Sequence, residues 1–381
     1  KTFIKKRKDE TQNLNFKFGK TGLKVSALGF GTMRLPLLED GVTVDEKEAV
    51  RIIRHAIDSG VNYVDTAYPY HQGTSEIVVG KALGDGYRDK VFLADKSPIW
   101  KLEKESDFDS ILEEQLQKLQ TDHIDFYLLH ALNKERFEKI KNFHLIDHML
   151  EARKAGKIRY LGFSFHDDLE VFKQIVDYTD QWDFCQIQYN YINRAYQAGD
   201  EGLTYAAEKG LAVIIMEPLL GGRLANLSEH VAEVFSKDKT SVEHALDFLW
   251  DKKEVSLLLS GMGTEQQVED NLVYAGRSAV GMLTAEEKKQ YEKAKEIYDK
   301  MSMVDCTGCA YCMPCPFVLN IPELFKAYNT YGPEGKDGMK REYEKQQVRS
   351  DSCRSCHRCE KVCPQNIKIS EQMKKIAELM K

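Results

Sequence analysis

The protein is a chain of 381 residues, of which 42% are hydrophobic, with a formal net charge of −6 at pH 7. This length is sufficient for one large hydrophobic core and a small appended domain. No run of eighteen apolar residues occurs, so we expect no membrane span, and the charge does not predict a nucleic-acid partner. Cys185 is the only cysteine before residue 306, and no secretory hydrophobic segment precedes it. We therefore expect a reducing compartment, the cytoplasm.

The chain begins with a lysine-rich stretch, and we predict a solvated basic arm over 1–15. From residue 27 to 275, short apolar runs alternate with amphipathic stretches, the pattern of parallel strands joined by crossover helices. Eight such strand–helix units predict a TIM (β/α)8 barrel over 16–283. No G-x-G-x-x-G follows the first strand, which disfavours a doubly wound dinucleotide-binding sheet. The predicted strands are 27–31, 62–67, 91–96, 124–130, 158–165, 184–190, 211–218 and 255–261.

Helices are predicted between these strands, including 45–59, 107–119, 138–155 and 241–250, several of them followed by glycine at the C-cap. After the last barrel unit, Thr284 and Glu287 have the spacing of a capping box. We predict a connector helix over 284–303, followed by a small, mainly helical domain over 304–381.

Polar side chains end three neighbouring predicted strands. Asp65, Lys96 and His130 close the second, third and fourth strands, and Tyr70 follows the second. In a TIM barrel, chemistry is located at the carboxyl ends of the strands. An ammonium near a phenol lowers the pKa of the phenol, so Tyr70 can act as a general acid beside Lys96. Asp65 would orient Lys96, and His130 would donate a hydrogen bond to a carbonyl oxygen.

The predicted C-terminal domain contains eight cysteines in two runs, each ending in Cys-Pro. The second run has the bacterial ferredoxin spacing, in which three thiolates hold one cubane and the fourth reaches the other; the first run is shorter by one residue before its fourth cysteine. Zinc is the alternative, but four-cysteine zinc sites need only two closely spaced cysteines per arm. We predict two [4Fe–4S] clusters, one held by Cys306, Cys309, Cys312 and Cys363, and the other by Cys353, Cys356, Cys359 and Cys315.

These motifs resemble those of the aldo/keto reductase superfamily over about 16–271. The resemblance is carried by Asp65-Thr-Ala-Tyr-Pro-Tyr70, by Ala94-Asp-Lys96 and by Tyr127-Leu-Leu-His130, with Leu28-Gly-Phe-Gly-Thr-Met33 and Gly162-Phe-Ser164 in support. It implies a catalytic tetrad of Asp65, Tyr70, Lys96 and His130. The cysteine tail, with Cys306-Thr-Gly-Cys309 and Asn320-Ile-Pro322, is similar to that of the ferredoxin-tailed branch of this superfamily.

The resemblance also implies a nicotinamide cofactor. In the family, a serine–asparagine pair and a glutamine hold the carboxamide, and an aromatic ring stacks on the nicotinamide. Here Ser164 and Gln186 align, whereas Phe165 replaces the asparagine and Met216 replaces the aromatic residue. The expected diphosphate loops are Gly221-Gly222-Arg223 and the loop from Gly261 and Gly263 to Asn271.

The loop at 261–271 contains no basic residue and includes Glu265, Glu269 and Asp270. Carboxylates suit a ribose hydroxyl better than the 2′-phosphate of NADP. An NADP preference is therefore not predicted, and a flavin remains open as a further cofactor.

Two functions are compatible with these features. The first is an NAD(P)-dependent oxidoreductase that reduces a small carbonyl or oxidises an alcohol, with clusters that are structural or pass electrons to an external carrier. The second is an iron–sulfur electron-transfer or redox-sensing module whose barrel binds a nucleotide or flavin without turnover. Hydride carries two electrons and each cluster carries one, so the two cofactors do not exchange electrons directly. We expect Trp100, Tyr68, His71 and Arg194 to line the substrate pocket.

Overall fold

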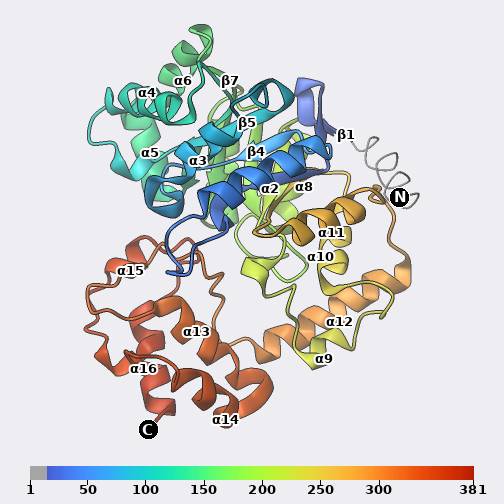
Figure 1. The fold of residues 1–381 in the computed structure, drawn as a ribbon, viewed down its shortest axis with the longest axis vertical. Coiled ribbons are helices and arrows are strands. Elements are labelled where there is room, and N and C mark those ends of the chain that lie inside the picture. The colour runs from blue at the N-terminus through green and yellow to red at the C-terminus, as the bar shows by residue number, and fades with distance from the viewer. Residues whose placement is uncertain (1–14) are drawn as a thin grey trace. The chain divides into compact units, whose positions relative to one another are not determined.

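The computed structural model describes residues 15–381, so the predicted basic arm lies outside the described residues except at its last position. Eight parallel strands close into a barrel in the order β10-β3-β4-β5-β6-β7-β8-β9, which confirms the predicted TIM barrel (Figure 1). Its strands are β3 (Leu28–Gly31), β4 (Tyr63–Asp65), β5 (Phe92–Ser97), β6 (Ile124–Leu132), β7 (Ile158–Phe165), β8 (Phe184–Gln188), β9 (Ala212–Met216) and β10 (Val255–Gly261).

The barrel strands are buried on both faces. Every residue of β6 is buried, as is every residue of β8. Parallel strands covered by helices on one side and packed into the barrel interior on the other are apolar along their whole length. This burial explains why the sequence shows continuous apolar runs instead of alternation.

An antiparallel hairpin precedes the barrel, formed by β1 (Asn15–Phe18) and β2 (Leu23–Ser26). Phe18 is fully buried, with its ring centroid 4.8 Å from that of Phe126 and 6.0 Å from that of Phe184. Phe184 is the first residue of its strand, so the hairpin packs at the amino ends of the strands. The carboxyl ends, where the predicted tetrad lies, are at the opposite end.

Helices follow the strands around the barrel. One prediction was wrong: the stretch 138–155 is two helices, because the chain turns at His144, which has a left-handed backbone (φ 48°, ψ 38°). The helices of this part are α2 (Glu46–Asp58), α3 (Ser75–Ala82), α4 (Asp107–Leu119), α5 (Lys134–Asn142), α6 (Leu145–Lys154), α7 (Leu169–Tyr178), α8 (Gly199–Glu208), α10 (Ser241–Trp250) and α11 (Glu265–Ala275).

The described chain divides into two compact units. The first contains the barrel. The second contains 190–192, 219–245 and 283–381, with α9 (Glu229–Ala232), α12 (Ala285–Met301), α13 (Ile321–Asn329), α14 (Tyr331–Tyr343), α15 (Arg358–Lys361) and α16 (Ile369–Leu379). Helix α12 begins with the predicted capping box of Thr284 and Glu287, and it buries Tyr291 and Tyr298 in the second unit.

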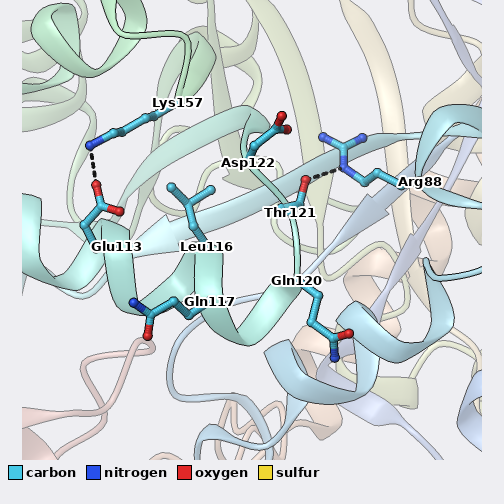
Figure 2. A pocket seen from close by; sticks show the side chains of 8 residues that line it. All are labelled: Arg88, Glu113, Leu116, Gln117, Gln120, Thr121, Asp122 and Lys157. Carbon is cyan, nitrogen blue, oxygen red and sulfur yellow. Dashed lines mark hydrogen bonds and ion pairs between the residues drawn. The ribbon is translucent and has the colours of Figure 1, made fainter.

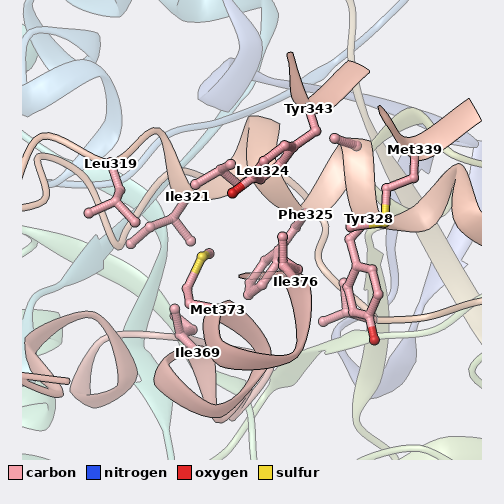
Figure 3. Close-up of a cluster of buried hydrophobic side chains, with 12 residues drawn as sticks. Leu319, Ile321, Leu324, Phe325, Tyr328, Met339, Tyr343, Ile369, Met373 and Ile376 are labelled. Atoms are coloured by element: carbon pink, nitrogen blue, oxygen red, sulfur yellow. The ribbon is translucent and has the colours of Figure 1, made fainter. Parts of the chain in front are cut away.

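The second unit has a hydrophobic core of its own, shown in Figure 3. Leu324 and Phe325 from α13 meet Met339 from α14 and Met373 and Ile376 from α16, and all five are buried. Six of the eight cysteines of the two runs pack against this core. No helix within residues 15–381 has both the length and the apolar character needed to cross a bilayer.

Candidate active site

The four predicted catalytic side chains come together at the carboxyl ends of β4, β5 and β6. The Lys96 ammonium donates to both Asp65 carboxylate oxygens at 2.7 and 2.8 Å, and to the Thr66 carbonyl at 2.6 Å. Its distance to the Tyr70 hydroxyl is 3.5 Å. Lys96 is fully buried and Asp65 is 2% exposed. Four groups from separate elements thus share one buried site.

Charge in this site is balanced by pairing. Burial raises the pKa of Asp65, and the neighbouring Lys96 opposes that rise. A buried carboxylate and ammonium are stable together only when hydrogen bonds replace their lost water, and the three short bonds of Lys96 meet this condition. Asp65 therefore fixes the position of the ammonium beside Tyr70.

His130 is the neutral member of the group. Burial lowers its pKa well below the ordinary value, and the charges of Lys96 and Arg136 lower it further. Its ring stands nearly perpendicular to that of Tyr70, with centroids 6.2 Å apart. Buried Nδ1 of His130 has no hydrogen-bond partner within the described residues. A neutral imidazole with an unused ring nitrogen can serve a bound ligand.

Of the residues expected to line the substrate pocket, Trp100 lies against the tetrad. Its ring centroid is 5.1 Å from that of His130, and the Arg136 guanidinium lies 4.9 Å from the Trp100 ring centre. Tyr68 instead donates its hydroxyl to Glu114. His71 contacts the backbone of Thr32 and Leu35, and Arg194 pairs with Asp200.

Behind Lys96 lies a buried polar cluster that the sequence analysis missed. The Gln115 amide nitrogen of α4 donates to Glu76 of α3 at 2.8 Å, to Asp95 of β5 at 2.8 Å and to the Lys96 carbonyl at 3.1 Å. Burial, followed by the nearby Glu76 charge, raises the pKa of Asp95 well above its ordinary value. The available signal was Asp95 itself, a carboxyl next to Lys96 in a buried strand, on the opposite face of that strand.

The residues predicted to hold a carboxamide lie on adjacent strands, with Ser164 of β7 opposite Gln186 of β8. The Gln186 amide nitrogen faces the Met216 sulfur at 3.6 Å, and its buried carbonyl oxygen has no partner within residues 15–381. An orphaned buried acceptor fits the amino group of a carboxamide. Phe165 points away from this site, because its ring packs against Phe172 of α7 at 5.0 Å.

The predicted diphosphate glycines lie in two different units. In the second unit, Arg223 donates to the Val304 carbonyl at 3.2 Å and to the Ser302 hydroxyl at 2.8 Å. A β-carbon on Gly221 would lie 1.9 Å from the Thr307 carbonyl oxygen, so only glycine fits there. These residues, with Gly222 between them, hold the start of the cysteine segment, and their diphosphate role stays a prediction.

In the first unit, the loop after β10 differs in charge from what its sequence suggests. The stem of Arg34 lies against Gly261, where a β-carbon would be 3.1 Å from that of Arg34. Glu265 pairs with Arg51 of α2 at 2.7 Å, and Glu269 pairs with His55 at 2.6 Å. Asn271 is buried and donates to Ser260 at 3.1 Å. The three carboxylates of this loop led to the prediction of poor 2′-phosphate binding. Two of them are paired with side chains of α2.

Cysteines of the two runs lie near one another. Burial raises the pKa of Cys312, and the next contributions come from the nearby Cys309, Cys306, Cys363 and Cys359. For Cys359, burial and the Glu360 charge raise the pKa to about 11, with further contributions from Cys353 and Cys356. The first three thiols of each run are thus close together, and Cys363 of the second run reaches the first.

Within residues 15–381, no three His, Cys, Asp or Glu side chains meet closely enough to hold a single metal ion. This spread is compatible with a cubane, because its four thiolates bind four separate iron atoms. The donor set therefore fits iron–sulfur clusters.

A separate pocket of about 790 Å3 lies in the barrel unit and is shown in Figure 2. Its walls include Gln120, Thr121 and Asp122, which precede β6, together with the ion pair of Lys157 and Glu113. It contains none of the tetrad residues. Because it lies at the amino end of β6, it is not a candidate for the predicted chemistry.

Comparison with known proteins gives matches for both units. The family described as "Aldo/keto reductase family" matches residues 27–296, and the "4Fe-4S dicluster domain" matches residues 302–367. The L-galactose dehydrogenase of Arabidopsis thaliana is 30% identical over 280 residues, which are 67% of this chain and 85% of that protein. The aldo-keto reductase YhdN of Bacillus subtilis is 32% identical over 214 residues, 54% of this chain and 61% of that protein.

Solved structures give the same result. The holo form of an aldo-keto reductase from Bacillus halodurans has a TM-score of 0.62 at 28% identity, covering 74% of this chain and 96% of its own. An aldo-keto reductase from Klebsiella pneumoniae, in complex with NADPH, has a TM-score of 0.59 at 25% identity, covering 74% of this chain and 94% of its own.

Proposed function

The chain belongs to the aldo/keto reductase family and is an oxidoreductase, and from this premise we propose that it interconverts a small carbonyl compound and its alcohol, with Tyr70 as the general acid and base. The observation that carries the proposal is the buried contact of Lys96 with Asp65 and with the Tyr70 hydroxyl. A nicotinamide, when bound, supplies or accepts the hydride. The chain's own residues supply the proton and hold the reacting oxygen.

Each tetrad residue has a separate role. Tyr70 donates its hydroxyl proton to the carbonyl oxygen, and the ammonium of Lys96, 3.5 Å away, stabilises the phenolate that remains. Asp65 accepts two hydrogen bonds from Lys96 and holds its ammonium in place. His130 is neutral, so its one N–H can hydrogen-bond the carbonyl oxygen and direct it toward Tyr70.

We assign the nicotinamide site to the residues around Gln186. Its unpartnered carbonyl oxygen can accept from a carboxamide amino group, and Ser164 lies beside it on β7. The NADPH complex of the Klebsiella pneumoniae relative supports a nicotinamide here. The loop at 261–271 decides between NAD and NADP.

We assign two [4Fe–4S] clusters to the second unit, the first to Cys306, Cys309, Cys312 and Cys363, and the second to Cys353, Cys356, Cys359 and Cys315. The neighbours of Cys312 and Cys359 support these sets. Such clusters, when present, accept and release one electron each. Cysteine thiolates held at fixed spacing by the buried core of α13 and α16 suit this role.

Replacing Tyr70 with phenylalanine tests the acid–base role. Tyr70→Phe removes the proton donor and keeps the ring, so we expect kcat for carbonyl reduction to fall about 100-fold or more, with little change in nucleotide affinity. The measurement is cofactor oxidation with a panel of small aldehydes and ketones.

Tyr68→Phe is the matched control, because the Tyr68 hydroxyl is bonded to Glu114 and not to the tetrad. It should retain the wild-type rate. If Tyr70→Phe turned over every substrate as fast as the wild type, the tetrad would have no acid–base role here.

The alternative, a redox module without carbonyl turnover, draws support from Phe165, which packs outward where the family has an asparagine. Anaerobic titration with NADH and NADPH separates the two functions. The oxidoreductase should oxidise the cofactor only when a carbonyl is present. Bleaching of the cluster absorbance by the nucleotide alone, with no carbonyl turnover, would favour the module and would require a mediator between hydride and single electrons.

A further inference from the structure

Basic side chains without an ion-pair partner in the described residues lie within and beside the second cysteine run. Arg354, Arg358, Lys361 and Lys368 are all exposed, and none pairs with an acidic residue in the described part of the chain. The two acidic residues between 349 and 368 do not neutralise them. Glu360 contacts Ser370 and His357 instead. Asp351 precedes Cys353, whereas the four basic residues follow it. The segment therefore presents a net positive charge to solvent.

These cations flank the most accessible cysteine. Cys356 is exposed, whereas the other seven cysteines of the two runs are partly buried. Arg354 precedes Cys356 by two residues and Arg358 follows it by two. Since both stand between successive cysteines of one predicted ligand set, their backbones must lie close to that cluster. Val362, 41% exposed, adds an apolar surface beside Cys363.

The other parts of the second unit differ in charge. The stretch 306–322, which holds the first cysteine run, contains no charged residue. On α13 and α14, several basic residues pair with acidic neighbours, as in Lys326 with Glu323 and Arg341 with Glu334. Exposed basic side chains without an acidic partner in the described chain also occur on α14 and α16, but only at the second run do they stand between cysteines of one predicted ligand set.

We propose that this surface, formed by Arg354, Cys356, Arg358, Lys361 and Val362, is the docking site of an acidic one-electron carrier protein. The proposal rests on the second cluster of the proposed function. Complementary charge steers transient partners and raises their association rate, and small, weak interfaces are typical of redox encounters. A carrier bound here would approach the cluster at its exposed ligand.

The electron step balances without any other reactant. A reduced [2Fe–2S]+ carrier and an oxidised [4Fe–4S]2+ cluster become [2Fe–2S]2+ and [4Fe–4S]+. One electron moves, and no proton or atom is transferred. The reverse direction uses the same surface.

Binding of an acidic plant-type [2Fe–2S] ferredoxin to the holoprotein tests the proposal. Calorimetry at low salt should detect a complex whose affinity falls as salt screens the charges. Arg354→Glu together with Arg358→Glu should weaken binding about tenfold or more. Basic cytochrome c should not bind the wild type.

Lys336→Glu with Lys340→Glu on α14 is the matched control, because it makes the same charge change on a helix without cysteines. It should shift ferredoxin affinity by no more than about twofold. Equal weakening by both double variants would overturn the proposal, as would the absence of salt-sensitive binding or binding of phosphatidylserine vesicles in place of ferredoxin. Iron content and cluster absorbance are measured first, so that loss of the cluster is distinguished from loss of docking.

Discussion

Lys96 depends on buried polar groups on both faces of its strand. Its ammonium meets Asp65 inside the barrel, and its carbonyl accepts from Gln115 outside it. The same Gln115 nitrogen joins Glu76 and Asp95, and its oxygen accepts from the Tyr127 hydroxyl. One amide thus lies within hydrogen-bond distance of four buried groups and connects α4 to the strand that presents Lys96.

Removing this amide should destabilise the barrel. Gln115→Leu keeps the volume but removes the amide partner of two buried carboxyl groups and of the Tyr127 hydroxyl, so we expect a loss of about 2–4 kcal/mol in the free energy of unfolding. Urea unfolding followed by tryptophan fluorescence measures it. Gln117→Leu, exposed on the same helix, should cost little. Equal stability of the two variants would contradict the role assigned to Gln115.

His130 should make barrel stability fall in mild acid. Burial holds its folded pKa well below the ordinary value, so below about pH 6.5 the unfolded chain binds a proton that the folded chain does not. The free energy of unfolding then decreases with falling pH, by up to about 1.4 kcal/mol per pH unit from this group. The contribution is fully present above pH 6.5. His130→Gln should flatten the curve between pH 6.5 and 5, and parallel curves for variant and wild type would exclude this linkage.

At the scale of elements, α2 alters the charge of the loop after β10. The pairs of Arg51 with Glu265 and of His55 with Glu269 place basic side chains of α2 against two carboxylates of α11. The sequence of that loop predicted poor binding of a 2′-phosphate. Two of its three carboxylates are already engaged by α2, so we expect less discrimination against NADP than the loop sequence alone implies.

Releasing Glu265 should restore that discrimination. Arg51→Gln frees the carboxylate, and because exposed pairs contribute about 0.2–1 kcal/mol, the affinity for 2′,5′-ADP should fall about 1.4- to 5-fold. The affinity for 5′-ADP should not change. Arg54→Gln is the control. Arg54 is on the same helix as Arg51, and this change removes its pair with Asp85. Identical effects of Arg51→Gln on both nucleotides would show that Glu265 does not affect the phosphate.

For the whole molecule, the two units should respond separately to loss of a cluster. The second unit has a small core against which its cysteines pack, so its stability should depend on its metal centres. All three tryptophans, Trp100, Trp182 and Trp250, belong to the barrel unit and report only on it.

Cys309→Ala should therefore reduce iron from about eight to about four atoms per chain and lower the unfolding temperature of the second unit. The urea midpoint from tryptophan fluorescence should stay unchanged. Cys185→Ala, which removes the buried cysteine of β8, should keep all the iron. Loss of iron from both variants, or stoichiometric zinc in the wild type, would refute the assignment of the cluster cysteines.

The sequence by itself determined the barrel, the position of the tetrad residues at strand ends and the two cysteine runs. Each of these is encoded at short range, in apolar runs of strand length, in the polar residue that ends a run and in the spacing between ligands. The bounds predicted for 107–119 and 241–250 agree with α4 and α10 for the same reason. Where the local signal was weak, as at Phe143 and His144, the prediction joined two helices into one.

Only the tertiary structure decided which distant side chains meet. Glu76, Asp95 and Gln115 come from α3, β5 and α4, and no local pattern relates a helix face to the outward face of a strand. Arg51 and Glu265 are 214 residues apart, so the charge of the loop after β10 could not be obtained from its own sequence. Electrostatic interactions depend on distance in space, and a folded chain brings together charges that its sequence keeps apart.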